Sequence, residues 1–206
     1  PANHPVASLN KLYHASLNPL YFEDKALIIH NYKGSSFIVH SSSLKKLLTN
    51  CLTHYSLCYG TLSVEELLSE LRKNGYSTFA LTDINNTSAC LDAIRMSRDF
   101  GLKPVMGIDF RNGVTQKYVG LARNNTGFRE LNEHLSKHLH SGEKFDETAP
   151  EFHHAYIIYP GESYRGWPLR DNEFLGIPIR LLSRLAFLPV LQKHRSRWVA
   201  MQETVF

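Results

Sequence analysis

The chain has 206 residues, of which 43% are hydrophobic and 20% charged, and its formal net charge is +4. This length suits one ordinary domain with a real core plus a fragment of a second, and the composition excludes intrinsic disorder. Short apolar runs broken by charges exclude a membrane-spanning segment, and the N-terminal residues lack a secretory pattern. The mild positive charge permits contact with nucleic acid without requiring it. Three cysteines form no even framework, so we expect a reducing, cytoplasmic environment.

The first 48 residues carry few structural signals. Residues 26–29 and 36–39 can each form a short strand, and residues 31–35 between them have turn chemistry, so a hairpin is one interpretation. An upstream extension is the other. We therefore leave residues 1–48 as an unassigned N-terminal extension.

From residue 49 onward the pattern becomes regular. Ser63 followed by Glu66 forms a capping box at the start of a helix, and Gly75 ends that helix. The apolar face of the helix consists of Leu67, Leu68 and Leu71. A short buried strand over residues 78–82 then ends in Asp83.

The next elements repeat this order. A helix is predicted over residues 87–100, and a strand over residues 104–108 ends in Asp109. A strand over residues 117–122 leads to a helix capped by Thr126, and residues 155–159 form a further strand. Strand, helix and strand at this spacing predict parallel βαβ units, which place carboxylates just after the strands, where α/β folds carry their chemistry.

Four stretches between Asn50 and Arg111 resemble the PHP (polymerase and histidinol phosphatase) domain at the N-terminus of bacterial DNA polymerase III alpha subunits, in its Bacteroidetes-like form. They are residues 50–56, 60–67, 80–87 and 101–111. Residues 170–177 and 199–206 resemble the segment that leads toward the polymerase core of that family.

The resemblance implies an α/β fold, a distorted seven-stranded (β/α) barrel of which this chain supplies a part. Residues 49–160 would form the PHP domain. Residues 161–206 would begin the connection toward a polymerase core. The nucleotidyltransferase chemistry of that family needs an Asp-x-Asp motif, which is absent from these 206 residues.

The metal-binding positions of the family are only partly kept. An intact PHP site has a His-x-His pair after its first strand, an Asp-His after the second and an acidic residue after the third. Asn50 and Leu52 stand at the two histidine positions. Asp83 matches the aspartate, Ile84 replaces its histidine, and Asp109 stands in the third motif. Three imidazoles are therefore lost and two carboxylates remain.

Two carboxylates can still hold a hard ion such as Mg²⁺ weakly with water, whereas a Mn or Zn hydrolytic cluster is disfavoured. His54 shares strand parity with Leu52, so one hypothesis adds it to Asp83 and Asp109 as a metal ligand. The alternative is that His54 is an ordinary polar residue in a loop. The resemblance assigns no catalytic residue and no resident cofactor beyond this weak divalent-metal site.

Other motifs have ordinary explanations that we favour. His134 and His138 have the i, i+4 spacing of helical zinc ligands, but no third ligand is evident at motif spacing. His153 and His154, just before a predicted strand, are equally weak candidates for metal ligands. The arginines after residue 160 can meet DNA phosphates, but a solvated face or a docking surface suits them better.

Three functional hypotheses remain at this stage. The first is a structural PHP fragment of a DNA polymerase III alpha subunit, acting in DNA replication. Its partners would be the rest of that chain, proofreading or clamp subunits and, indirectly, DNA. The second is a stand-alone metal-dependent phosphoesterase. The third is a decayed reading frame.

Overall fold

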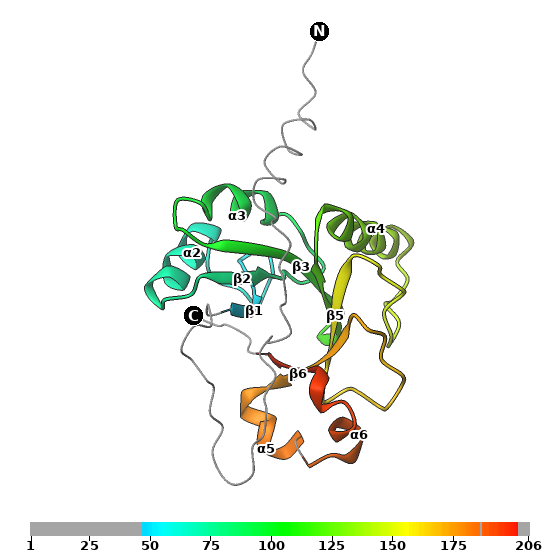
Figure 1. Ribbon diagram of the computed structural model, residues 1–206. Coiled ribbons are helices and arrows are strands. Elements are labelled where there is room, and N and C mark those ends of the chain that lie inside the picture. Colours follow the sequence, from blue (N-terminus) through cyan, green and yellow to red (C-terminus); the bar gives the residue numbers. More distant parts are fainter. Residues whose placement is uncertain (1–46, 186, 202–206) are drawn as a thin grey trace.

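The computed structural model describes residues 47–185 and 187–201, which form one seven-stranded sheet with helices around it (Figure 1). The two strands predicted at residues 26–29 and 36–39 lie outside the described residues. The strands are β1 (Leu47–Cys51), β2 (Thr78–Leu81), β3 (Lys103–Asn112), β4 (Thr115–Ala122), β5 (Ala155–Pro160), β6 (Glu173–Pro178) and β7 (Trp198–Met201).

Strand order in the sheet follows chain order, and the sheet nearly closes on itself. The Thr49 hydroxyl of β1 donates to the main-chain oxygen of Ala200 in β7 at 3.0 Å, which brings the first and last strands together. The predicted α/β class and barrel-like sheet are confirmed.

The expectation of parallel units holds for only part of the sheet. The β1–β2–β3 and β5–β6–β7 pairings are parallel, whereas β4 is antiparallel to both of its neighbours. The physical reason lies between β3 and β4, where Gly113 adopts a φ of 60° in a two-residue connection. Such a tight hairpin can join only antiparallel strands.

The first predicted helix is confirmed as α2 (Val64–Lys73). Its capping box is present, because the Ser63 hydroxyl accepts from the Glu66 main-chain N–H and the Glu66 carboxylate accepts from the Ser63 main-chain N–H. The predicted leucine face is buried. After the helix, Gly75 has a φ of 74°, as a helix-ending glycine requires.

Two other helices differ from prediction at their ends. Helix α3 (Cys90–Met96) is shorter than residues 87–100, because three-residue turns such as Asp99 N–H to Met96 O replace helical hydrogen bonds. Helix α4 (Asn125–Ser141) is capped by Asn124, whose side-chain oxygen accepts from the Gly127 N–H at 2.9 Å. Thr126 already lies inside the helix, so the predicted cap was wrong.

The segment predicted to be a connection supplies strands of the same sheet. β6 pairs with β5 and β7 pairs with β6. Short helical elements lie between them: η1 (Ile179–Leu181), α5 (Leu182–Leu185), α6 (Pro189–Gln192) and η2 (Arg195–Arg197). The predicted domain boundary at residue 160 remains a prediction. Within the described residues, no helix has both the length and the apolar character needed to cross a lipid bilayer.

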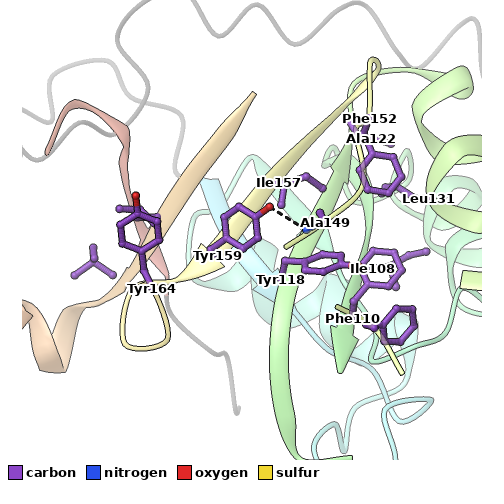
Figure 2. Packing of buried hydrophobic residues seen from close by; sticks show 14 of the residues in the cluster. Ile108, Phe110, Tyr118, Ala122, Leu131, Ala149, Phe152, Ile157, Tyr159 and Tyr164 are labelled. Atoms are coloured by element: carbon purple, nitrogen blue, oxygen red, sulfur yellow. Dashed lines mark hydrogen bonds between the residues drawn. The ribbon is translucent and has the colours of Figure 1, made fainter. Parts of the chain in front are cut away.

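The largest buried cluster contains residues of β3, β4 and α4 together with residues of β5 and β6 (Figure 2). The aromatic rings of Phe110, Tyr118 and Tyr159 are fully buried in it, and the Tyr159 hydroxyl accepts from the Ala149 N–H at 3.0 Å. A second cluster packs α2 and α3 against β1 and β2. These two cores fix β1, β2 and β3, and the predicted site residues lie on these strands or just after them.

Candidate functional site

The predicted site residues lie on or just after three neighbouring strands: Asn50 lies within β1 and Asp83 follows β2. Asp109 lies within β3 and not after it as predicted, because β3 continues to Asn112 in its hairpin with β4. The main-chain N–H of Thr82 donates to the carbonyl of Cys51 at 2.9 Å, and the N–H of Asp109 donates to the carbonyl of Asp83 at 3.2 Å. Ile84 and Asp109 form an isolated parallel bridge. Main-chain hydrogen bonds therefore place the sequence motifs side by side on neighbouring strands.

The Asp83 carboxylate is 2% exposed, and the loop after β1 satisfies both of its oxygens. Oδ1 accepts from the Thr53 main-chain N–H at 2.7 Å and from the Ser56 hydroxyl at 2.6 Å. Oδ2 accepts from the Thr53 hydroxyl at 2.7 Å. Three short, charge-assisted hydrogen bonds compensate this carboxylate for the loss of water.

The same loop is closed by a glycine. The Gly60 N–H donates to the Ser56 carbonyl at 2.9 Å, and a Cβ at residue 60 would lie 1.9 Å from the main-chain oxygen of Thr53. Gly60 is therefore required for the turn that brings Thr53 and Ser56 to Asp83.

Gly60→Ala is expected to lower the free energy of unfolding by about 1–3 kcal/mol, because the new methyl group forces the loop away from Asp83. Chemical denaturation measures the change. Leu57→Ala, in the same loop at a side chain that is 80% exposed, is the matched control and should change stability by less than about 0.5 kcal/mol. Equal stabilities for wild type and Gly60→Ala would contradict the role given to this turn.

Asp109 is completely buried, and its partners lie on β3 and β4. Its Oδ2 accepts from Arg111 Nε at 2.9 Å and Nη2 at 2.7 Å, and from Gln116 Nε2 at 2.8 Å. The Arg111 side chain is 4% exposed and its guanidinium carbon lies 4.7 Å from the centre of the Tyr59 ring. The positive charge that offsets this buried carboxylate thus comes from the protein itself.

Asn85 joins the β2 end to the β3 edge around this ion pair. Its side chain accepts from the Arg111 N–H at 2.9 Å and donates to the Arg111 carbonyl at 2.8 Å, as a neighbouring strand would. Its own N–H donates to the Asp109 carbonyl at 3.0 Å. Asn85 has a φ of 47°, a left-handed conformation that asparagine adopts more readily than most residues.

The remaining motif positions present no imidazole. Asn50 is buried and its side-chain oxygen accepts from the Thr82 hydroxyl at 2.5 Å, so it belongs to a hydrogen bond inside the sheet. Leu52 is buried and Ile84 is partly buried. Neither has a lone pair for a metal.

His54 is exposed in the loop after β1. Its Nδ1 lies 3.3 Å from the Leu62 carbonyl and its ring lies 4.4 Å from that of Tyr55. Across residues 47–185 and 187–201, no three His, Cys, Asp or Glu side chains gather in a way that could hold a metal ion. The donor set present, two carboxylates engaged by protein hydrogen bonds, does not fit the divalent-metal centre that PHP domains usually carry.

The histidine pair of α4 packs against aromatic side chains. His134 Nε2 lies 2.7 Å from the Tyr118 hydroxyl oxygen, and its ring lies 5.3 Å from that of Phe110 and 5.6 Å from that of Phe145. His138 Nδ1 lies 2.9 Å from the His134 carbonyl. Burial, followed by the neighbouring His138, lowers the pKa of His134 to about 4.

This lowered pKa makes stability depend on pH. Below the ordinary histidine pKa of about 6.5, His134 is protonated in the unfolded chain but stays neutral in the folded one. The free energy of unfolding therefore falls as the pH drops from about 6.5 toward 4. We expect this residue to contribute about 3 kcal/mol of that loss. Urea unfolding at several pH values should show a flatter profile for His134→Gln than for wild type. Parallel profiles would contradict the prediction.

The three cysteines are free, and only Cys58 is exposed. Burial, followed by the nearby charge of Asp83, raises the pKa of the Cys90 thiol to about 12. Cys90 therefore stays a neutral, weakly reactive thiol at physiological pH.

Four residues that complete the site were not predicted from the sequence: Thr53, Ser56, Arg111 and Gln116. A local signal existed for one of them. Asp109 and Arg111 are two apart on a strand, so their side chains share a face and can form an ion pair. Thr53 and Ser56 lie 30 and 27 residues from Asp83 and carried no such signal.

The PHP domain family matches residues 49–165. Among curated proteins, the chain is similar to the DNA polymerase III subunit alpha of Bacillus subtilis, with 31% identity over 119 residues, 52% of this chain and 10% of that protein. It is also similar to the DNA polymerase III subunit alpha of Ureaplasma parvum and to an error-prone DNA polymerase of Pseudomonas syringae pv. tomato. Each is 30% identical over 82 residues, 40% of this chain and 8% of the relative. The chain thus spans 8–10% of the length of these relatives.

Among solved structures, the chain is similar to a candidate metal-dependent phosphoesterase from Bifidobacterium adolescentis, with a TM-score of 0.37 and 21% identity over 46% of this chain and 32% of that one. It is also similar to an amidohydrolase from Chromobacterium violaceum, with a TM-score of 0.37 and 19% identity over 44% of this chain and 32% of that one.

Proposed function

The chain belongs to the PHP domain family, and on that premise we propose that it is the N-terminal PHP module of a bacterial DNA polymerase III alpha subunit, with a structural role in DNA replication. The similarity to alpha subunits from two organisms supports this assignment. Its main partner would be the remainder of the alpha chain, since the relatives are many times longer than the segment they share with it. Proofreading or clamp subunits would be further partners, and the compartment would be the cytoplasm.

The observation that carries the structural role is the engagement of both remaining carboxylates by the protein's own donors. Thr53 and Ser56 satisfy Asp83, and Arg111 with Gln116 binds Asp109. A divalent ion at Asp83 would have to displace buried hydrogen bonds, and at Asp109 it would meet a buried guanidinium of the same charge sign. We infer that these residues hold the strand ends together and do not ligate a metal.

Hydrolysis of a phosphoester by this family requires a metal cluster that activates water. Leu52 and Ile84 cannot bind a metal, and the Asn50 side-chain oxygen already accepts from Thr82. No other residue at the ends of β1, β2 and β3 replaces the missing imidazoles within the described chain. The arrangement therefore favours a structural module over a stand-alone phosphoesterase.

Metal content and activity test this proposal together. The chain would be purified by gel filtration after incubation with Mn²⁺ and Zn²⁺, analysed for bound metal, and assayed with p-nitrophenyl phosphate and a 3′-phosphorylated DNA end. We expect substoichiometric metal, no hydrolysis above background and the same thermal midpoint with and without EDTA. Stoichiometric metal with hydrolysis that is lost in Asp83→Asn/Asp109→Asn would establish the phosphoesterase instead.

The replicative assignment has a separate test. Sequencing the genomic DNA across both ends of this reading frame should reveal a continuous frame that reaches an Asp-x-Asp motif of a polymerase palm. A stop codon directly after Phe206 would contradict membership in an alpha subunit.

A further inference from the structure

We propose that the crossover between β6 and β7, residues 179–185 and 187–197, is a contact surface for single-stranded nucleic acid. This inference goes beyond the structural role above, which concerns the carboxylates of β1, β2 and β3, and it does not depend on that role. In Figure 1, α5 and α6 of the crossover lie below the sheet, away from α2, α3 and α4.

The crossover carries positive charge without any compensating carboxylate in its sequence. No Asp or Glu occurs between Glu173 and Glu203, whereas five Lys and Arg residues do. They are Arg180, Arg184, Lys193, Arg195 and Arg197. A segment whose charged side chains are all positive, in a chain of only mild net charge, is typical of a surface that binds a polyanion.

Two of these five cations are used within the fold. Arg197 Nη2 donates to Asp171 Oδ1 at 3.3 Å, and the Arg195 guanidinium lies 5.6 Å from the centre of the Trp198 ring. The other three, Arg180, Arg184 and Lys193, are exposed, and no carboxylate of the residues that the structure describes forms an ion pair with them.

The orientation of the crossover is fixed by its apolar side chains. Leu185 and Leu191 are buried in the largest core cluster. Leu181, Leu182 and Val190 pack against the same cluster. Because the apolar side chains anchor the crossover to the sheet, its exposed cations remain directed to solvent, where a ligand can reach them.

For these cations the sequence alone favoured a solvated face or a docking surface, but the structure adds an exposed aromatic ring that lies between them in the chain. The Phe187 side chain is 79% exposed and the adjacent Leu188 is 41% exposed, in the turn between α5 and α6. An exposed phenyl ring flanked by cations in the sequence is suited to stack on an unpaired base while Arg and Lys contact phosphates. A double helix hides the faces of its bases, so the ring favours a single strand as the ligand.

Fluorescence anisotropy with a labelled oligothymidylate of about 20 nucleotides tests the proposal on the full chain. Arg180→Gln/Arg184→Gln/Lys193→Gln is expected to weaken binding at least about tenfold at low salt, and to reduce the slope of log K against log salt by about 2. Phe187→Ala should weaken binding by about five- to a hundredfold and leave the salt slope unchanged, because it removes stacking and no charge.

The matched control removes the same number of charges elsewhere. Lys73, Arg95 and Arg129 lie on α2, α3 and α4, with side chains 73%, 62% and 70% exposed. Their triple glutamine variant should bind within about twofold of wild type if the crossover is the contact surface. Thermal midpoints of all variants are measured first. If the crossover triple variant is unfolded, Phe187→Ala and the single variant Arg184→Gln take its place.

Three results would overturn the proposal. Equal losses in the crossover and control variants would mean that only net charge matters. Unchanged binding by Phe187→Ala would remove the aromatic contact. Competition by polyglutamate as strong as competition by unlabelled oligothymidylate would indicate an acidic protein surface as the partner. None of these results depends on metal content or on the reading frame, so failure here is distinguishable from failure of the structural role.

Discussion

Replacing Arg111 with alanine is expected to lower the free energy of unfolding by about 3–5 kcal/mol, the largest effect of any single change at the site. The variant leaves the fully buried Asp109 carboxylate with Gln116 but without its neutralising guanidinium, and it removes the contact with the Tyr59 ring. Burial of a charge without a counter-charge is far more costly than burial of a matched pair. Guanidinium chloride unfolding followed by circular dichroism measures the loss.

The control for this prediction is Arg95→Ala on α3, whose side chain is 62% exposed and lies 4.0 Å from Asp92. A surface pair of this kind contributes about 0–1 kcal/mol. The double variant Asp109→Asn/Arg111→Gln removes both charges and should recover much of the loss. A loss below about 1 kcal/mol for Arg111→Ala, or no recovery in the double variant, would show that Arg111 does not neutralise Asp109.

The elements that were predicted well are those whose signals are local. The Ser63–Glu66 capping box and the leucine spacing after it depend on contacts within a few residues, and α2 matches them. The end of α3 and the cap of α4 were wrong because several nearby residues can cap or end a helix. Thr126 and Asn124 have similar capping tendencies, and the extended backbone of Asn124 decides between them.

The antiparallel placement of β4 shows a different limit. Strand spacing alone suggested parallel units, but the direction of β4 depends on the connection before it. Residues 113 and 114 separate β3 from β4, and Gly113 takes a positive φ there. Predicting β3 to end at residue 108 instead of 112, and β4 to begin at residue 117 instead of 115, hides this hairpin, because the connection then seems long enough for other geometries.

The site shows how far a resemblance can replace structure. The family motifs placed Asn50, Asp83 and Asp109 on neighbouring strands, since motif order and strand order agree, but Asp109 lies within β3 and not after it. The partners of the carboxylates were not predicted, because hydrogen bonds over 27 to 30 residues depend on the fold of the loop after β1. Lost ligands indicate what a site cannot bind, whereas only the structure shows which groups have taken their place.

Asp83→Ala is expected to destabilise the chain by about 3 kcal/mol. It removes three hydrogen bonds at once, leaving the Thr53 N–H and the hydroxyls of Thr53 and Ser56 without their acceptor in a buried place. Each buried donor that loses its partner costs about 1–3 kcal/mol, and relaxation of the loop offsets part of the sum. Thermal and urea unfolding measure the loss.

Asp92→Ala on α3, where the carboxylate is 55% exposed, is the matched control and should change stability by less than about 0.5 kcal/mol. The prediction also separates the two roles open to Asp83. If Asp83 is a structural acceptor, Asp83→Ala lowers the free energy of unfolding equally in EDTA and in Mn²⁺, because the partners of Asp83 are the loop donors. If Asp83 is a metal ligand, Asp83→Ala is less stable than wild type only in the presence of the ion, since only the wild type is then stabilised by binding it. Stability that depends on Mn²⁺ in wild type and is absent from Asp83→Ala would therefore reverse the assignment of this carboxylate.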